Sequence, residues 1–370
     1  MKLIGGNRIL WRYVLTFVAG VVLASLFFVG RAWLDSPPDS VFASTEANAA
    51  AKAMRRQMAP HVARLMTGDI NDRREVLNDV YFAHRIAEAR DLYPVQERPI
   101  QVDGVYTEVF EPAGGVPEAN AGRVLINLHG GAFMFGARTQ GRLESIPVAS
   151  VAGMKVVSVD YRQGPEHSFP AASEDVATVY RHLLKRHRPQ QIGIFVCSAG
   201  GMLTAQAVAW FASHDLPQPG AVGIFCAGAG GMGAGDSAAI SETFGTNFAG
   251  DRGMAYFEGA SWDDPLVSPL EHPDFMAQFP PTLVITSTRD LAMSSGLATH
   301  QRLLAQGVSS ELHVYEGLIH YWFADTGLPE SRQAFRGMAD IIDRNLSRRH
   351  KFRVWKSLCC RVRMKAFSAG

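Results

Sequence analysis

The stretch I-G-I-F-V-C-S-A-G-G, residues 192–201, decides the fold, because it runs from an apolar strand into a turn of small residues and on into a helix. Its core, V-C-S-A-G, is one residue away from G-x-S-x-G, the turn that presents a nucleophilic serine at the end of a strand. Val196 stands where that motif has its first glycine. The stretch alone leaves two interpretations open: Ser198 is a nucleophile on an altered turn, or the segment is a turn without chemistry.

Cys197 adds a third interpretation, because a thiolate is intrinsically the stronger nucleophile. A motif centred on Cys197 reads F-V-C-S-A and lacks a glycine two residues later. A motif centred on Ser198 has Gly200 and Gly201 in place. The turn chemistry therefore favours Ser198, with Cys197 as a small buried side chain.

The composition indicates a globular protein. The chain has 370 residues, of which 47% are hydrophobic and 19% charged, and its net charge is +1. A charge so close to zero gives no sign of a nucleic-acid partner. The four cysteines, at 197, 226, 359 and 360, have neither the spacing of a zinc site nor that of a disulfide framework. We therefore expect no metal.

An uncharged run at the N-terminus predicts a membrane segment. Residues 14–30 carry no charge, and Ile9 to Tyr13 can extend the run if Arg12 reaches the headgroups. Lys2, Arg8 and Arg12 precede it, which predicts an anchor through residues 9–30 with the rest of the chain on the non-cytoplasmic side. The alternative is a signal peptide, cleaved near residues 30–32, and an exported protein.

Strand and helix patterns alternate along the rest of the chain. A hairpin is predicted over residues 99–110, around an Asp-Gly pair. Further strands are predicted at 124–128, 155–159, 192–196, 221–226, 282–286 and 311–315, and helices at 172–184, 201–213, 297–304 and 331–346. This order predicts an α/β fold with a mostly parallel sheet and helices on both faces. Chemistry in such sheets lies beyond the carboxyl ends of the strands.

Polar residues follow several of these strands. H-G-G-A-F, residues 129–133, follows the strand at 124–128 and has glycines that allow backbone N–H groups to face a ligand. Asp290 follows the strand at 282–286, and His320 follows the strand at 311–315. The chain order Ser198, Asp290, His320 is the order of the triad in α/β-hydrolases. Asp263, Asp264 and Glu316 are the alternative acids, although none has this spacing from a strand.

A wider set of motifs resembles one known family. The set comprises HGGAF at 129–133, D-Y-R at 160–162, P-E-H-S-F-P-A-A-S-E-D-V at 165–176, C-S-A-G-G at 197–201, R-D at 289–290 and H-x-x-F at 320–323. Over roughly residues 60–347 it resembles the hormone-sensitive lipase family of α/β-hydrolases. The departures from the family pattern are Val196, Ala132 in place of a third glycine, and Leu-Ala-Met-Ser after Asp290.

The resemblance implies an α/β-hydrolase fold with an eight-stranded core over residues 48–347 and a helical cap from 48–92 and 235–280. It implies cofactor-free hydrolysis of a small carboxylic ester or lactone by a serine acyl-enzyme. Ser198, Asp290 and His320 would be catalytic, and Gly130, Gly131, Ala132 and Ala199 would form the oxyanion hole. His129 would brace the oxyanion loop, and Asp160, Arg162, Glu166 and Asp175 would be structural.

The alternative function is that of a non-catalytic ligand-binding protein on the same fold.

Apolar residues beside the motifs predict a hydrophobic pocket, and the anchor favours a lipophilic ester. These residues are Phe133, Met134, Phe135, Met202, Tyr321, Trp322 and Phe323. The tail, residues 348–370, is basic and interleaved with apolar residues, which fits either a membrane surface or a solvated segment. No pattern indicates the oligomeric state.

Overall fold

The computed structural model describes residues 11–24, 38–243 and 254–346. In this part of the chain eight strands form one sheet, in the order β1-β2-β4-β3-β5-β6-β7-β8. The strands are β1 (Val95–Val102), β2 (Val105–Pro112), β3 (Val124–Asn127), β4 (Lys155–Val159), β5 (Ile192–Cys197), β6 (Ala221–Phe225), β7 (Thr282–Arg289) and β8 (Ser310–Ile319). β2 runs antiparallel to both of its neighbours and every other neighbouring pair from β4 to β8 is parallel. The predicted mostly parallel, eight-stranded sheet is confirmed.

The predicted hairpin is β1 and β2, which pair from Val95 with Pro112 to Val102 with Val105. The two residues of its turn, Asp103 and Gly104, have φ values of 47° and 92°. Two left-handed residues in succession are the geometry of the tight turn that matches the twist of paired strands, which explains the Asp-Gly sequence.

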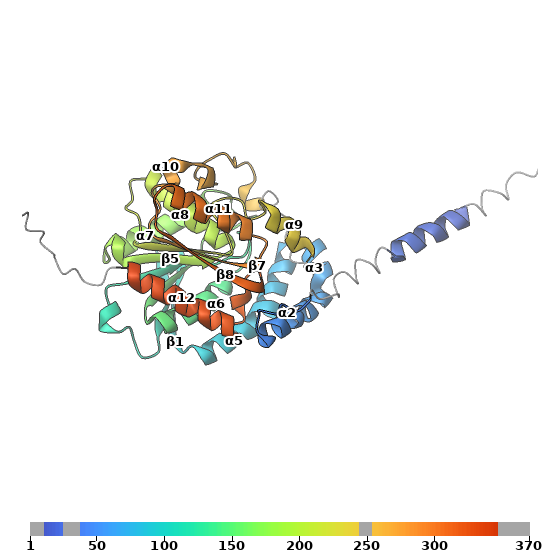
Figure 1. Cartoon of the computed structure of the whole chain (residues 1–370), viewed down its shortest axis with the longest axis horizontal. Helices are drawn as coiled ribbons and strands as arrows, with labels where there is room; N and C mark the ends of the chain where they lie inside the picture. Colours follow the sequence, from blue (N-terminus) through green and yellow to red (C-terminus); the bar gives the residue numbers. More distant parts are fainter. Residues whose placement is uncertain (1–10, 25–37, 244–253, 347–370) are drawn as a thin grey trace, which may run out of the picture.

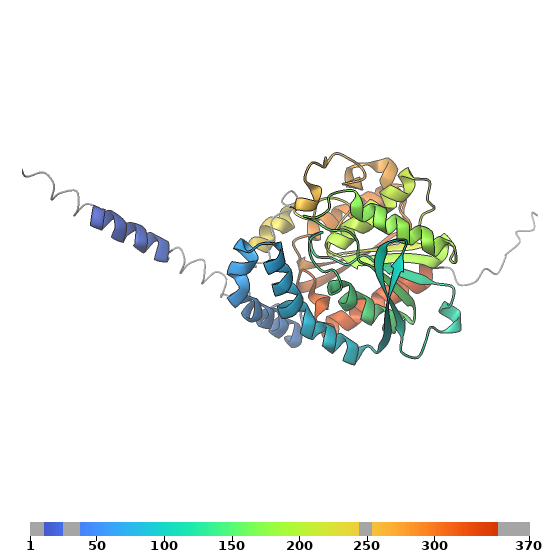
Figure 2. The same ribbon diagram turned by 180° about the vertical axis from the view of Figure 1, so that it is seen from behind.

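Helices cover both faces of the sheet (Figure 1). Helices α7 (Ala171–Leu184), α8 (Ala199–Ser213) and α11 (Met293–Ala305) lie on one side, and α5 (Ala83–Leu92), α6 (Gln140–Ala152) and α12 (Pro329–Asn345) on the other. The view from behind shows the same two helical layers, with the β1–β2 hairpin at one edge (Figure 2). The other helices and helical turns are α2 (Thr45–Met58), η1 (Ala59–His61), α3 (Val62–Thr67), α4 (Ile70–Glu75), η2 (Val76–Phe82), η3 (Glu118–Asn120), η4 (Pro189–Gln191), α9 (Asp236–Thr243), η6 (Ala255–Phe257), η7 (Pro269–Glu271), α10 (Pro273–Met276) and η8 (Trp322–Ala324).

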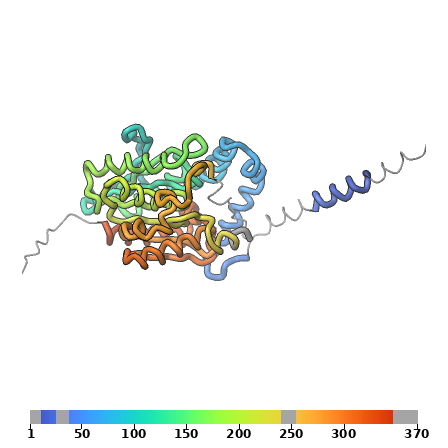
Figure 3. The backbone as a smooth tube through the Cα atoms, turned by 90° about the horizontal axis from the view of Figure 1, so that it is seen from above, coloured from blue at the N-terminus to red at the C-terminus, as the bar shows by residue number. Residues whose placement is uncertain are grey.

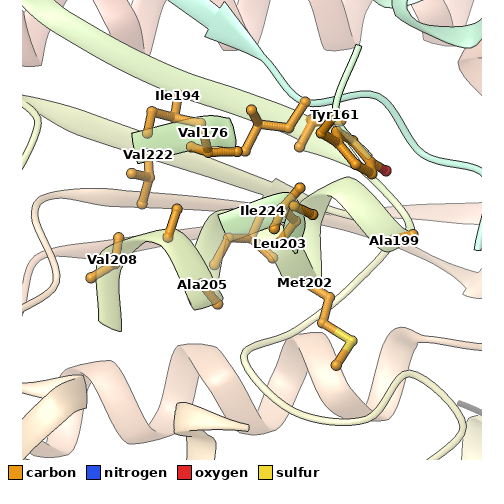
Figure 4. Packing of buried hydrophobic residues seen from close by; sticks show 14 of the residues in the cluster. Tyr161, Val176, Ile194, Ala199, Met202, Leu203, Ala205, Val208, Val222 and Ile224 are labelled. Carbon is orange, nitrogen blue, oxygen red and sulfur yellow. The ribbon is translucent and has the colours of Figure 1, made fainter. Parts of the chain in front are cut away.

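The sheet separates two hydrophobic cores. All six residues of β5 are buried, as expected for a central parallel strand. Successive side chains point to opposite faces, so Ile194 and Val196 join the core beneath α7 and α8, while Phe195 and Cys197 join the core beneath α6 and α12. Figure 4 shows the first core, where Ile194, Val222 and Ile224 of the sheet pack near Leu203 and Ala205 of α8. The nucleophile motif therefore begins on a strand that is fixed from both sides.

Helix α6 is absent from the sequence-based prediction. Nine of its thirteen residues are buried, and Pro147 lies within it. A helix that is buried on most sides shows no amphipathic stripe, and an internal proline normally argues against a helix. Both features hide α6 from pattern analysis.

The N-terminal helices α2, α3 and α4 lie together at one end of the molecule (Figure 3). A short break separates two of these helices, because α3 ends at Thr67 and α4 begins at Ile70. The Asp69 side chain caps α4 by accepting hydrogen bonds from the N–H groups of Asn71 and Asp72, at 2.8 and 2.9 Å.

Several predicted segments lie wholly or partly outside the described residues. Of the predicted anchor, 9–30, residues 11–24 are described and are helical. The described residues include no helix with both the length and the apolar character needed to cross a bilayer. The basic tail, 348–370, and residues 244–253 of the predicted cap segment are outside the described part, as are Cys359 and Cys360.

Candidate active site

Ser198 occupies a sharp turn between β5 and α8. Its φ is 63° and its ψ is −134°, a conformation that a residue with a side chain rarely adopts. The turn is held because the Ser198 N–H donates to Phe225 O at 2.8 Å and Ser198 O accepts from Met202 N at 3.2 Å. Such a strained strand-to-helix turn is the geometry that the motif predicts for a nucleophilic serine.

The structure answers the question raised by Val196. A Cβ atom on Gly200 would lie 2.6 Å from Cγ2 of Val196 and 2.5 Å from the carbonyl oxygen of His129. Val196 thus fills the space beside Gly200. A residue with a side chain at position 200 would collide with Val196 and with the backbone of His129. The strand and helix keep their close approach because the small residue stands on the helix side of the contact.

His320 connects Ser198 with Asp290. Nε2 of His320 lies 2.9 Å from Oγ of Ser198, and Nδ1 lies 2.7 Å from Oδ1 of Asp290. The Asp290 side chain is fully buried, so its carboxylate fixes the proton on Nδ1 and leaves Nε2 to accept from the serine hydroxyl. Ser198 and Asp290 precede His320 by 122 and 30 positions in the chain, yet all three come together at the carboxyl ends of β5, β7 and β8.

Asp290 is itself fixed by neighbouring groups. Its Oδ1 accepts from the N–H of Ala292 at 2.9 Å, and its Oδ2 accepts from Oγ1 of Thr286 at 3.2 Å. Of the alternative acids, Asp264 accepts from the N–H of Leu266 in its own turn, at 2.8 Å. The structure therefore brings the predicted acid, Asp290, to His320.

The HGGAF loop packs directly on the serine turn. A Cβ on Gly130 would lie 2.9 Å from Cys197 O, so the two backbones meet at this point. Gly131, Ala132 and Phe133 have φ values of 106°, 53° and 56°, which form a tight curve of left-handed residues. The start of the loop, His129 and Gly130, thus meets the backbone on both sides of Ser198 and Ala199, at Cys197 O and at Gly200.

His129 is buried inside this loop. Its Nδ1 lies 2.8 Å from Gly130 O, its ring stacks on Tyr161 at 4.3 Å between centroids, and its carbonyl accepts from the Tyr161 hydroxyl at 2.9 Å. Burial lowers the pKa of His129, so its ring stays neutral. The contacts agree with the bracing role that the family resemblance implies.

A cation from the N-terminal helices also holds the loop. Arg74, in α4, donates from Nε to Met134 O at 2.9 Å and from NH2 to Gly164 O at 3.1 Å. Its guanidinium also forms a two-point contact with Glu166, at 2.6 and 2.8 Å, which lowers the pKa of that carboxyl to about 2. Glu166 therefore has the structural role that the resemblance implies.

Cys197 does not have the environment of a nucleophile. Its side chain is fully buried, and burial raises its pKa well above the usual value, with a further contribution from the neighbouring thiol of Cys226. A buried thiol with a raised pKa supplies little thiolate. Sequence reasoning missed Cys226, whose Sγ lies within 4.8 Å of the Asp290 and His320 ligand atoms.

Several of the residues from which a hydrophobic pocket was predicted pack in the protein interior. Phe133 is fully buried and stacks on Tyr256 at 4.8 Å, and Trp322 and Phe323 belong to the core beneath α6 and α12. Met232, which the sequence analysis did not single out, lies with Sδ 4.0 Å from Ser198 Oγ.

The fold and this arrangement of side chains define an α/β-hydrolase with a serine, histidine and aspartate in line. A family model described as alpha/beta hydrolase fold matches residues 125–324. The chain belongs to this family, within which it is similar to the hormone-sensitive lipase group, and it is an esterase.

Curated and solved relatives agree with this assignment. A carboxylesterase/phospholipase, LipF, of Mycobacterium tuberculosis is 31% identical over an alignment of 263 residues, and the match covers 65% of this chain and 69% of the relative. An acetyl-hydrolase of Streptomyces hygroscopicus is 29% identical over 59% of this chain and 74% of its own. The crystal structure of an esterase, E25, has a TM-score of 0.71 and 30% identity, covering 84% of this chain and 98% of that one.

Proposed function

We propose that the protein hydrolyses small, hydrophobic carboxylic esters or lactones through an acyl-enzyme on Ser198. The observation that carries the proposal is the placement of His320 between the Ser198 hydroxyl, at 2.9 Å, and the buried Asp290 carboxylate, at 2.7 Å. A serine hydroxyl is a weak nucleophile unless a base in hydrogen-bond reach takes its proton.

The reaction has two halves. Oγ of Ser198 attacks the ester carbonyl carbon, its proton passes to Nε2 of His320, and the carbonyl oxygen becomes an oxyanion. The C–O bond to the alcohol then breaks, and His320 returns the proton to the departing alcohol. In the second half a water gives its proton to His320 and attacks the acyl group, and Ser198 leaves with that proton restored. Asp290 holds the imidazole tautomer and stabilises the imidazolium in both halves.

The proposed oxyanion donors are the N–H groups of Gly131, Ala132 and Ala199, with Gly130 shaping the turn. The left-handed backbone of the loop and its close packing on the serine turn support this assignment. Ala199 adds the favourable field of the N-terminus of α8, a helix of fifteen residues. Ala132 retains the donor although it replaces a glycine, because the donor is a backbone group.

The assay is ester hydrolysis by the full chain, in detergent, with nitrophenyl esters of increasing acyl length. Ser198→Ala should reduce kcat by about 10⁴–10⁶-fold while the unfolding temperature changes little. An organophosphonate should add covalently to Ser198, as peptide mass spectrometry would show. Turnover that survives in Ser198→Ala would refute the mechanism, and ester binding without turnover in the wild-type protein would support the ligand-binding alternative.

We also propose that the helices from 48–92 and 235–280 act as a cap, which the contact of Arg74 with Met134 O supports.

We further propose that residues 9–30 attach the protein to a membrane, with the catalytic domain on the non-cytoplasmic side. The uncharged run after three basic residues supports this proposal. Full-length chain should remain in carbonate-washed membranes, whereas a chain without residues 1–34 should not. N-terminal sequencing of the exported protein distinguishes an anchor from a cleaved signal.

A further inference from the structure

A cluster of four buried polar side chains lies under the serine turn and the HGGAF loop, outside the triad. Its members are Asn127 at the end of β3, Gln140 and Glu144 in α6, and Ser158 in β4, and they are exposed by only 0, 3, 3 and 6%. A carboxyl group so deeply buried costs free energy unless several donors satisfy it. We call this set the Glu144 cluster.

The Glu144 carboxylate accepts hydrogen bonds from two side chains. Nδ2 of Asn127 donates to Oε2 at 2.6 Å, and Nε2 of Gln140 donates to Oε1 at 3.2 Å. A single carboxylate thus links strand β3 with helix α6.

Asn127 extends this link to the oxyanion loop. Its Oδ1 accepts from the N–H of His129 at 3.1 Å and from Oγ of Ser158 at 3.2 Å. These two donors fix the orientation of the Asn127 amide and turn its NH2 group towards Glu144. The first residue of the loop is therefore tied to Glu144 through one side chain.

Gln140 supports the loop from below. Gly130 packs against the Gln140 amide so closely that a Cβ on Gly130 would overlap it, and a Cβ on Gly136 would lie 3.1 Å from Cβ of the same glutamine. The Gln140 amide in turn is held by Glu144. Gly130 therefore lies between the Gln140 amide and Cys197 O, the carbonyl of the last residue of β5.

We propose that Glu144 is a positioning residue for the oxyanion hole, because the HGGAF loop depends on its carboxylate. The loop is tied to Glu144 through Asn127 and Gln140, and the loop itself packs against Cys197 O, next to the serine turn. Donors to a developing oxyanion act only when they are fixed to within about 0.5 Å before the reaction. The inference rests on the proposed acyl transfer at Ser198.

A general loss of stability must be separated from a loss of positioning. The test compares an oxoester with the matching thionoester, because a developing thiolate is a weaker hydrogen-bond acceptor than an oxyanion. A displaced oxyanion hole lowers turnover of the oxoester far more than turnover of the thionoester. Simple unfolding lowers both rates equally and leaves their ratio unchanged.

The main variant is Glu144→Met, with Gln206→Met as its control, both in the full chain. Gln206 is likewise fully buried and donates to Val267 O at 2.9 Å, but it belongs to the middle of α8. The assays are run at pH 9, where Glu144 is ionised, since burial raises its pKa to about 8. Glu144→Met should lower kcat for the oxoester about 10²-fold, with KM changed less than threefold.

The oxoester-to-thionoester ratio decides the outcome. It should fall at least tenfold in Glu144→Met and stay at the wild-type value in Gln206→Met. Glu144→Gln, which keeps one acceptor oxygen and the shape, should recover part of the ratio. An unchanged ratio in Glu144→Met, or an equal fall in both Met variants, overturns the proposal.

If Glu144→Met does not fold, an unchanged ratio in Glu144→Gln at pH 9 overturns the proposal instead. The proposed function is tested separately, by comparing the wild-type protein with Ser198→Ala. Turnover that persists without Ser198 refutes the proposed function, and with it the positioning role that rests on that function. Wild-type turnover that depends on Ser198, together with an unchanged ratio in the Glu144 variants, removes only the inference about Glu144.

Discussion

Gly200→Ala is the substitution whose effect follows most directly from the structure. The added Cβ would lie 2.5 Å from His129 O and 2.6 Å from Cγ2 of Val196, about 0.5 Å closer than real contacts allow. The Val196 methyl group can yield slightly by rotation of its side chain. His129 O is a backbone atom that the Tyr161 hydroxyl also holds, at 2.9 Å, so the HGGAF loop must move as a unit.

The expected size follows from that displacement. A shift of about 0.5 Å is the limit within which a preorganised site still works, and loss of one oxyanion donor typically costs 10²–10³-fold in kcat. Inserting a methyl group into a packed interior costs about 1–3 kcal/mol of folding stability. We therefore expect Gly200→Ala to lower kcat by about 10²–10³-fold and the free energy of unfolding by about 1–3 kcal/mol.

The assay combines ester hydrolysis with urea unfolding, and it has a matched control. A Cβ on Gly114 would meet nothing within 4 Å, so Gly114→Ala should change neither quantity. In the double variant with Val196→Gly, one of the two clashes is removed but the contact with His129 O stays, so activity should remain low. A Gly200→Ala enzyme with kcat within threefold of wild type would refute the reasoning.

Three further predictions concern the triad, the buried carboxyl and the loop. Asp290→Asn should lower kcat by about 10⁴-fold with KM nearly unchanged, because an amide favours the wrong tautomer of His320; steady-state kinetics checks this. Burial raises the pKa of Glu144 to about 8, so the folded protein holds a proton that the unfolded chain releases near pH 4.5. The free energy of unfolding should therefore fall as pH rises from about 4.5 to 8, and Glu144→Gln should flatten this slope in urea titrations. Ala132→Gly should raise the urea midpoint, because relief of the φ of 53° is worth about 1–2 kcal/mol and the added chain entropy costs about 0.5–1 kcal/mol.

The strands and the triad could be predicted from the sequence because their signals are local. Each parallel strand is a short apolar run, and Ser198, Asp290 and His320 each stand just beyond the end of one strand. Parallel strands bring such ends to one edge of the sheet, so positions along the chain translate into neighbours in space. No comparable rule exists for α6, whose buried, proline-containing sequence lacks the periodicity that marks a helix at the surface.

The residues that follow His320 in the sequence were predicted to line a hydrophobic pocket, but they pack in the protein interior. Trp322 and Phe323 follow His320 at the second and third positions, yet the intervening Tyr321 has a φ of 60°, and both rings belong to the core beneath α6 and α12. Met232, which is 34 residues from Ser198 in the chain, lies with Sδ 4.0 Å from the Ser198 hydroxyl. The left-handed turn at Tyr321 depends on the surrounding packing, and the residue types alone do not predict it.

Glu144 illustrates the same difficulty for groups that act through others. Its partners come from β3 and its own helix, and the residues that link it to the loop are a neutral asparagine and a neutral glutamine. Neither charge pattern nor motif spacing singles out such a group, because its importance arises only when β3, α6 and the loop meet.

Val196 shows how a departure from a motif can be compatible with its geometry. The motif needs close packing between the strand before the serine and the helix after it, and a glycine on either side of that contact can supply the space. Here the methyl groups of Val196 take the strand side, and Gly200 leaves the helix side empty. The requirement for a small residue therefore applies to positions 196 and 200 together, and a glycine at one of them is enough. Val196→Gly on its own should leave a cavity that lowers the free energy of unfolding by about 2–4 kcal/mol, because the buried valine fills space that Gly200 cannot.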